Sequence, residues 1–157
     1  AWAKKAKDPL GTEGLQRLLV RFPKLKESLE ETLLGTLPFA DAGDAEAVLE
    51  EVAQRPEVEN PTKLALGLLK TLSAKGEWQD YGTPFGRWRV ERLLQTRPEF
   101  KQSLGPCALR LLERTQEEHA RRCLRVFQPK AEKVDKPAAY LTMLLRRRLL
   151  KNTVPPP

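Results

Sequence analysis

Side chains that bind metals or attack substrates are scarce in this chain of 157 residues, which has one histidine and two cysteines. A structural zinc site takes four cysteine or histidine ligands, so His119, Cys107 and Cys123 are too few. Two cysteines also cannot build a disulfide framework. We therefore expect no metal and no cofactor. We expect an intracellular reducing compartment in which both thiols are buried as small apolar side chains; cytoplasm, nucleus and organelle stay open.

Long apolar runs and catalytic motifs are missing as well. No run approaches the roughly 18 residues that a membrane-spanning helix needs, so no membrane span is expected. There is no glycine-rich phosphate loop, nucleophile elbow or paired-histidine motif. His119 lies in a polar helix start that we expect to be solvated, and adjacent carboxylates such as Glu50 and Glu51 diverge by about 100° around a helix. We therefore expect a protein that is not an enzyme.

What the sequence does contain is an internal repeat with an offset of 75 residues. Segment 18–29 recurs at 93–104, and after a one-residue slip segment 58–69 recurs at 134–145. Such long-period self-similarity is typical of tandem supersecondary units. The matched pairs include Leu18/Leu93, Leu19/Leu94, Pro23/Pro98, Lys26/Lys101, Ser28/Ser103, Leu29/Leu104, Pro61/Pro137 and Leu68/Leu144.

Apolar spacing predicts four helices in each copy. Leu15, Leu18, Leu19 and Phe22 fall at i, i+3, i+4 and i+7, which is one face of a helix that Pro23 ends. Nothing predicts a strand. The expected helices cover residues 11–22, 25–37, 45–54 and 61 onward, and then 86–96, 99–113, 116–127 and 137–151. The predicted fold class is all-α, with two tandem copies of a roughly 75-residue four-helix unit packed as one helical stack. Repeat 1 covers residues 11–73 and the basic repeat 2 covers residues 90–151.

Several expected helix starts carry capping residues. Asp44 is a candidate N-cap for the third helix of the first copy. Thr115 followed three residues later by Glu118 reads as a capping box in the second copy. Asn60 precedes Pro61, a cap followed by proline at the first helical position.

The predicted linker, residues 74–89, holds four aromatic side chains: Trp78, Tyr81, Phe85 and Trp88. One interpretation is that these rings pack into the seam between the repeats and bury apolar area. The other is a partly exposed platform, because Arg87 and Arg89 flank Trp88 and a basic aromatic surface can stack bases.

The two copies differ in their balance of positive and negative residues. Residues 1–75 carry 11 Lys and Arg against 12 Asp and Glu, whereas residues 76–157 carry 17 against 9. Glu46 and Glu50 align with Arg121 and Arg125, and each pair is spaced i, i+4 on one helix face. Arg122 widens the basic side. This reversal fits a solvated face that drifted in charge, units with different partners, or units that pair through opposite charge.

The strongest basic run is 146–148, followed by Lys151. Cations at a helix C-terminus are favourable, which accounts for one or two of these charges. A third positive charge indicates a polyanion or an acidic protein surface as partner. Arginine suits phosphate because it can form two parallel hydrogen bonds to it. The candidate nucleic-acid-binding residues are Arg87, Trp88, Arg89, Arg121, Arg122, Arg125, Lys133, Arg146, Arg147, Arg148 and Lys151.

The start of each closing helix resembles a known element. Residues 58–61 (Val-Glu-Asn-Pro) and 134–141 (Val-Asp-Lys-Pro-Ala-Ala-Tyr-Leu) resemble the N-P-S-A-Y-V/L element that opens the closing helix of tandem helical-repeat proteins in algae and protists. A fainter likeness is to closing helices of replication-initiator-type DNA-binding proteins. The first copy departs from the element at 62–64 and lacks its aromatic residue. The resemblance implies a repeat family to which organellar and RNA-associated roles are attributed, and it transfers no site residue.

The sequence hypothesis is therefore a non-enzymatic helical-repeat module that binds nucleic acid, RNA in preference to DNA, through its basic second repeat. RNA is favoured by the aromatic and arginine-rich linker and by the resemblance. The alternative is a protein-interaction or structural subunit of a larger assembly. In that case the linker aromatics anchor a partner and residues 146–148 meet an acidic protein surface. The oligomeric state stays open.

Overall fold

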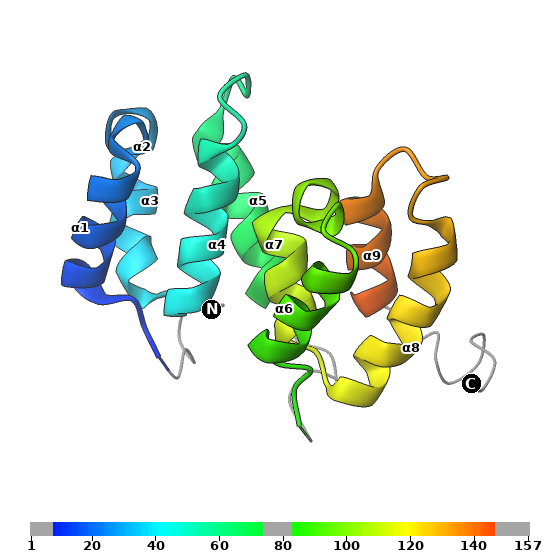
Figure 1. The fold of residues 1–157 in the computed structure, drawn as a ribbon. Coiled ribbons are helices and arrows are strands. Elements are labelled where there is room, and N and C mark those ends of the chain that lie inside the picture. The colour runs from blue at the N-terminus through cyan, green and yellow to red at the C-terminus, as the bar shows by residue number, and fades with distance from the viewer. Residues whose placement is uncertain (1–7, 74–82, 147–157) are drawn as a thin grey trace. The chain divides into compact units, whose positions relative to one another are not determined.

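The computed structural model describes residues 8–73 and 83–146, and throughout these ranges the fold is all-helical, with no β-strand (Figure 1). This confirms the predicted all-α class. The described residues fall into two compact units, one within residues 1–74 and the other within residues 75–157.

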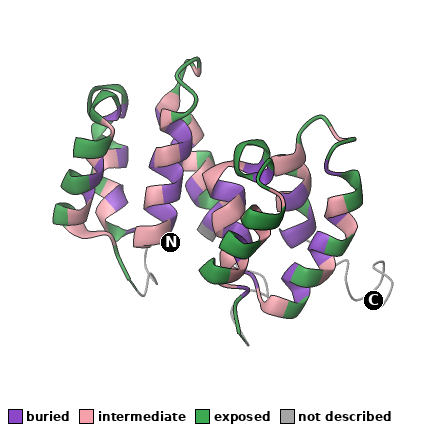
Figure 2. Ribbon diagram, viewed as in Figure 1, coloured by how far each residue is buried: buried purple, intermediate pink, exposed green. Residues whose placement is uncertain are grey.

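The first unit is built from short helices that enclose one apolar core. Helix α4 packs on α5, and α1 packs on α4 and on the 3₁₀ turn η1. The buried side chains lie on the facing sides of the helices (Figure 2), as the predicted spacing requires. The elements are α1 (Gly11–Arg21), α2 (Pro23–Ser28), α3 (Glu31–Thr36), η1 (Leu37–Phe39), α4 (Ala42–Ala53) and α5 (Pro61–Ser73).

The described part of the second unit is also built from helices that enclose one core. Helix α9 packs against both α7 and α8, and α6 packs on α7. Its core is more aromatic than that of the first unit, because Phe100 and Phe127 are 1% and 0% exposed. The elements are α6 (Arg87–Thr96), α7 (Phe100–Arg114), α8 (Glu117–Phe127), the 3₁₀ turn η2 (Gln128–Lys130) and α9 (Pro137–Arg146).

The predicted continuous helix over residues 25–37 is wrong. Leu29 and Glu30 are extended, with ψ of 140° and 151°, and separate α2 from α3. The buried Thr62 holds this break, because its Oγ1 accepts a hydrogen bond from the Glu30 amide at 3.0 Å. The second unit bends at the matching position, 75 residues on, where Gly105 has a φ of +78° inside α7. A side chain strains this backbone conformation, so glycine suits it.

Two predicted caps are also wrong. The N-cap of α4 is Asp41, whose Oδ1 accepts a hydrogen bond from the Asp44 amide at 3.1 Å. The N-cap of α8 is the side chain of Gln116, and the Thr115 hydroxyl donates back to the Leu111 carbonyl at 2.7 Å. In both cases the capped amide donates to a side chain three residues earlier. Asp41 lies three residues before the predicted Asp44, and Gln116 lies one residue after the predicted Thr115. The predicted Asn60 cap is confirmed, because its Oδ1 accepts from the Lys63 amide at 3.0 Å.

Two backbone hydrogen bonds, which we call the backbone clamp, join the segments from which α6 and α8 of the second unit begin. The Phe85 amide donates to the Thr115 carbonyl at 2.7 Å, and the Glu117 amide donates to the Thr83 carbonyl at 2.8 Å. Gly86, with a φ of +90°, then turns the chain into α6. Residues 83–89 of the predicted linker are therefore part of the second unit, and both helices begin at the same end of it (Figure 1).

The first unit has the same clamp 75 residues earlier. The Leu10 amide donates to the Ala40 carbonyl at 2.8 Å, and the Ala42 amide donates to the Asp8 carbonyl at 2.8 Å. Gly11, with a φ of +75°, turns the chain into α1. Matching hydrogen bonds at a constant offset therefore bring together the starts of α1 and α4 in the first unit and the starts of α6 and α8 in the second unit.

Candidate nucleic-acid interface

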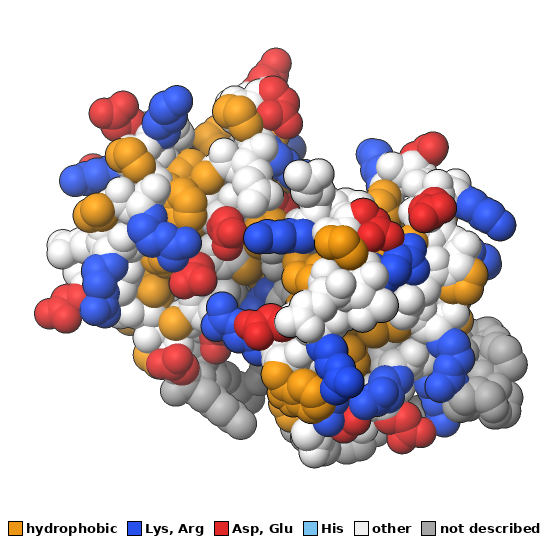
Figure 3. Space-filling view, in the orientation of Figure 1, with side chains coloured by type: hydrophobic (Ala, Val, Ile, Leu, Met, Phe, Trp, Pro, Cys, Tyr) orange, Lys and Arg blue, Asp and Glu red, His pale blue; other side chains and the backbone are white. Residues whose placement is uncertain are grey.

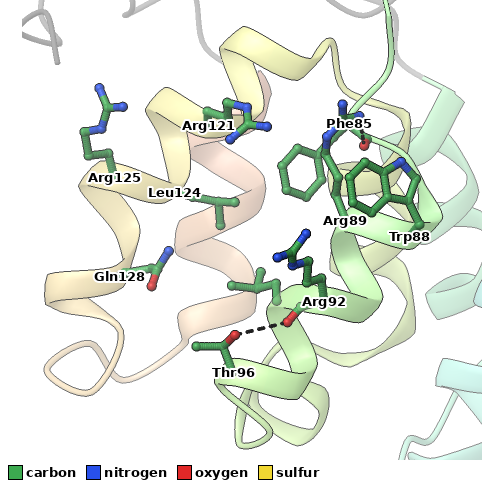
Figure 4. A pocket seen from close by; sticks show the side chains of 10 residues that line it. Phe85, Trp88, Arg89, Arg92, Thr96, Arg121, Leu124, Arg125 and Gln128 are labelled. Carbon is green, nitrogen blue, oxygen red and sulfur yellow. Dashed lines mark hydrogen bonds between the residues drawn. The ribbon is translucent and has the colours of Figure 1, made fainter.

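A basic pocket of about 420 Å³ lies between α6 and α8 of the second unit (Figure 4). The backbone clamp brings the starts of the two helices together. Side chains from both helices then form the walls of the pocket. Leu93 and Leu124 supply apolar side chains, and Thr96 and Gln128 supply polar ones at one end. The remaining lining residues are Phe85, Trp88, Arg89, Arg92, Arg121 and Arg125.

Helical spacing brings four arginines into this pocket. Arg89 and Arg92 are three residues apart on α6, and Arg121 and Arg125 are four apart on α8, so each pair shares a helix face. One carboxylate, Glu117, contacts the cluster: its Oε1 lies 2.9 Å from Arg121 Nη2 and 3.2 Å from Arg89 Nη2. Among residues 8–73 and 83–146, no acidic side chain pairs with Arg92 or Arg125. The pocket therefore carries excess positive charge.

The guanidinium of Arg89 is held in place beside the Trp88 ring by several contacts. Its Nη1 donates to the Phe85 carbonyl at 2.7 Å, and its guanidinium carbon lies 4.7 Å from the centroid of the Trp88 ring. Its side chain is 20% exposed. A guanidinium that contacts a carbonyl, Glu117 and an aromatic ring keeps one orientation. Arg89 therefore helps to position the Trp88 ring against which it packs.

Trp88 presents a large ring to solvent. It is 57% exposed, whereas Phe85 is buried within the second unit. Phe85 is therefore a core residue of the second unit, and its burial there does not test packing into a seam between the repeats. The exposure of Trp88 is what the platform interpretation requires of that ring. Trp78 and Tyr81 lie outside the described residues. An exposed ring beside four guanidinium groups offers stacking and phosphate contacts at one place.

The other predicted site residues that fall within the described ranges do not line this pocket. Arg87 is exposed and pairs with Glu91 at 3.6 Å, and Arg122 pairs with Glu118 at 2.9 Å. Lys133 is exposed in the loop after η2, and Arg146 is exposed at the end of α9. Arg147, Arg148 and Lys151 lie outside the described residues. Lys and Arg side chains nevertheless gather on the face of the second unit shown in Figure 3, beside a hydrophobic patch.

Sequence reasoning missed six of the lining residues: Phe85, Arg92, Leu93, Thr96, Leu124 and Gln128. The sequence could have indicated Arg92, because it follows Arg89 by three residues on the same predicted helix and therefore shares a helix face with it. The others are visible only once α6 and α8 lie side by side, since their residue types indicate no ligand.

The matching surface of the first unit has the opposite charge on one helix. Glu46 and Glu50 on α4 stand where Arg121 and Arg125 stand on α8. Glu46 lies 3.6 Å from Arg21 of α1, in an exposed ion pair. The basic pocket is therefore a property of the second unit's residues and not of the backbone arrangement alone.

His119 is buried, which corrects the prediction of a solvated side chain. It is 6% exposed, and its Nε2 lies 3.0 Å from the Leu145 carbonyl of α9, to which the neutral ring donates. Cys123 donates to the Leu144 carbonyl at 3.3 Å. Desolvation lowers the pKa of His119 and raises the pKa of Cys123 to about 12. These two side chains tie α8 to the end of α9, and the Cys123 thiol is not activated.

This burial predicts a pH dependence of stability. The unfolded chain takes up a proton on His119 below its ordinary pKa of about 6.5, whereas the folded chain, with a lowered pKa, does not. The free energy of unfolding should therefore decrease as pH falls below about 6.5. Urea titrations at pH 7.5 and pH 5.0 should show a smaller decrease for His119→Gln than for the wild-type chain. Equal decreases would contradict this role of His119.

No group of three or more His, Cys, Asp or Glu side chains in the described ranges could hold a metal ion. Within those same ranges no helix is both long and apolar enough to cross a membrane. Comparisons with protein-family models, curated proteins and solved structures give no match. Any functional conclusion therefore depends on the pocket itself.

Proposed function

We propose that the second unit binds single-stranded nucleic acid, RNA in preference to DNA, without a catalytic step. The observation that carries this proposal is the exposed Trp88 ring beside Arg89, Arg92, Arg121 and Arg125 in one pocket. Guanidinium groups suit phosphate oxygens, and an exposed indole suits the face of an unpaired base. In a duplex the bases are stacked on each other and cannot reach such a ring. RNA is preferred to DNA because sequence-specific RNA recognition commonly stacks unpaired bases on aromatic rings, and because the closing helices resemble those of repeat proteins with RNA-associated roles.

We further propose that the two units are copies of one helical repeat. Support comes from the sequence match at an offset of 75 residues, the two identical backbone clamps, and the positive φ of both Gly11 and Gly86. In this proposal the repeat supplies the frame, and substitutions on α6 and α8 supply the binding chemistry. The resemblance of the closing helices to tandem helical-repeat proteins agrees with it.

The direct test removes the stacking platform. Trp88→Ala should weaken binding of a fluorescein-labelled 12-nucleotide single-stranded RNA by about 5- to 150-fold, because stacking contributes about 1–3 kcal/mol per base. Fluorescence polarisation with the full chain, at several salt concentrations, measures this. Single-stranded DNA and duplex DNA of the same sequence serve as comparison ligands.

Two variants control the experiment. Trp88→Phe keeps an aromatic face and should retain most of the affinity. Phe39→Ala removes another exposed aromatic side chain, 64% exposed, from the first unit and should have no effect. Absence of salt-sensitive binding to all three nucleic acids, or equal affinity of the Trp88→Ala variant, would overturn the proposal and favour an acidic protein partner.

A further inference from the structure

The size of the basic pocket limits how much of a strand it can hold. Its volume is about 420 Å³, and its lining comes from residues 85–96 and 121–128. Pockets that enclose one small ligand measure about 300–1,000 Å³. A single strand that runs along a binding groove contacts it over about 4–16 nucleotides. The pocket therefore suits one nucleotide of a strand and not a run of several.

The charge of the pocket exceeds that of one phosphate inside a strand. Four guanidinium groups line it and one carboxylate, that of Glu117, contacts them, which leaves an excess of three positive charges. A phosphate inside a strand carries one negative charge. A phosphate monoester at a strand end carries about 1.5 to 2 negative charges at pH 7 and offers three acceptor oxygens. For a pocket with room for one nucleotide, a terminal phosphate is therefore the better match in charge.

The arginines that are open to a ligand approach the pocket from both helices. Arg92 extends from α6 and Arg121 extends from α8 into the space between them, whereas Trp88 and Arg89 lie together at one end (Figure 4). Arg92 and Arg121 are both exposed, so a ligand can reach them. Guanidinium groups on two sides of one phosphate can each form a pair of parallel hydrogen bonds to its oxygens.

We propose that this pocket binds the terminal nucleotide of a single strand, with its phosphate monoester between Arg92 and Arg121 and its base against Trp88. The inference rests on the proposed function and adds which part of the strand the second unit recognises. Arg89 keeps its contacts with Glu117 and the Trp88 ring, so it supports the base-stacking side of the pocket. The recognised chemistry is a phosphate monoester, which either a 5′ end or a 3′ end can carry.

The test compares three 12-nucleotide single-stranded RNAs of one sequence, with a 5′-phosphate, with a 3′-phosphate, or with hydroxyls at both ends. Each carries fluorescein at an internal position, and polarisation titrations use the full chain at pH 7.5. At least one phosphorylated RNA should bind about tenfold or more tightly than the hydroxyl RNA, because one charge-assisted hydrogen bond changes affinity by about that factor. Equal affinities of all three RNAs would overturn this inference and leave the proposed function standing. Absence of binding to all three would overturn both.

Two single variants separate the pocket from general attraction between charges. Arg92→Gln removes a guanidinium inside the pocket, so it should weaken binding of the phosphorylated RNA about tenfold and that of the hydroxyl RNA much less. Arg87→Gln removes one charge from the same helix at a residue that pairs with Glu91 outside the pocket, so the preference should persist. Both arginines are exposed, so both variants should keep the fold. An equal loss of preference in the two variants would contradict the inference.

The preference should also depend on pH in a direction that the ligand sets. A phosphate monoester takes up its second proton at about pH 6, so at pH 5.0 it carries about one negative charge, as a phosphate inside a strand does. The ratio of the affinities for phosphorylated and hydroxyl RNA should therefore fall towards one between pH 7.5 and pH 5.0. Each ratio compares two ligands on the same folded chain, so changes in protein stability cancel. A preference that stays constant over this range would show that the pocket does not recognise the second negative charge, which would overturn the inference.

Discussion

The double variant Arg121→Glu/Arg125→Glu is expected to bind single-stranded RNA at least about 100-fold more weakly than the wild-type chain. It gives α8 the residues that α4 has at Glu46 and Glu50, on the same backbone frame. Each lost charge-assisted contact costs about 1.5 kcal/mol or more, and every 1.4 kcal/mol is tenfold in affinity. The salt dependence should decrease as well, by about 0.7 in the slope of log K against log salt for each lost phosphate contact.

A charge-matched control distinguishes the pocket from general electrostatic attraction. Lys26→Glu/Lys63→Glu changes two exposed cations of the first unit and shifts the net charge by the same amount. Polarisation titrations should show only a modest loss for this control. A similar loss in both double variants would mean that net charge, and not the arginine pocket, determines binding.

The Phe127→Ala variant is expected to lose about 3–5 kcal/mol of unfolding free energy in the second unit. Phe127 is fully buried, and its centroid lies 5.5 Å from that of Phe100 and 6.0 Å from that of Tyr140. Removing the ring leaves a cavity and deletes two aromatic contacts. The change should also loosen the end of α8, which carries Arg125 and the wall of the basic pocket.

Urea titrations combined with amide hydrogen exchange measure this loss unit by unit. Exchange should accelerate in α7 and α9, and exchange in α4 and α5 should change much less. Val52→Ala at the matching position of the first unit removes fewer atoms from a buried side chain, so it should cost less. A loss below about 1 kcal/mol for Phe127→Ala would show that the second core collapses around the gap.

Helix positions followed from the sequence where local signals act alone. Proline ends α1 through its effect on the preceding residue, and the Asn60 cap with Pro61 starts α5, as expected. The break at Leu29 and Glu30 had no local signal, because a distant hydroxyl, that of Thr62, stabilises it. His119 likewise lies in a polar segment, and only the packing of α9 on α8 buries it.

The sequence by itself determined the all-α class, the residue matches at an offset of 75 and the residue types of the basic surface, because helical periodicity and charge are local properties of the chain. It also identified Trp88, Arg89, Arg121 and Arg125 as candidates. Arg87 and Arg122 pair with Glu91 and Glu118, each four residues away on its own helix, so these two ion pairs are local. Only the tertiary structure brought the four candidates together. The reason is that the pocket depends on two backbone hydrogen bonds between segments about 30 residues apart, from which α6 and α8 start side by side.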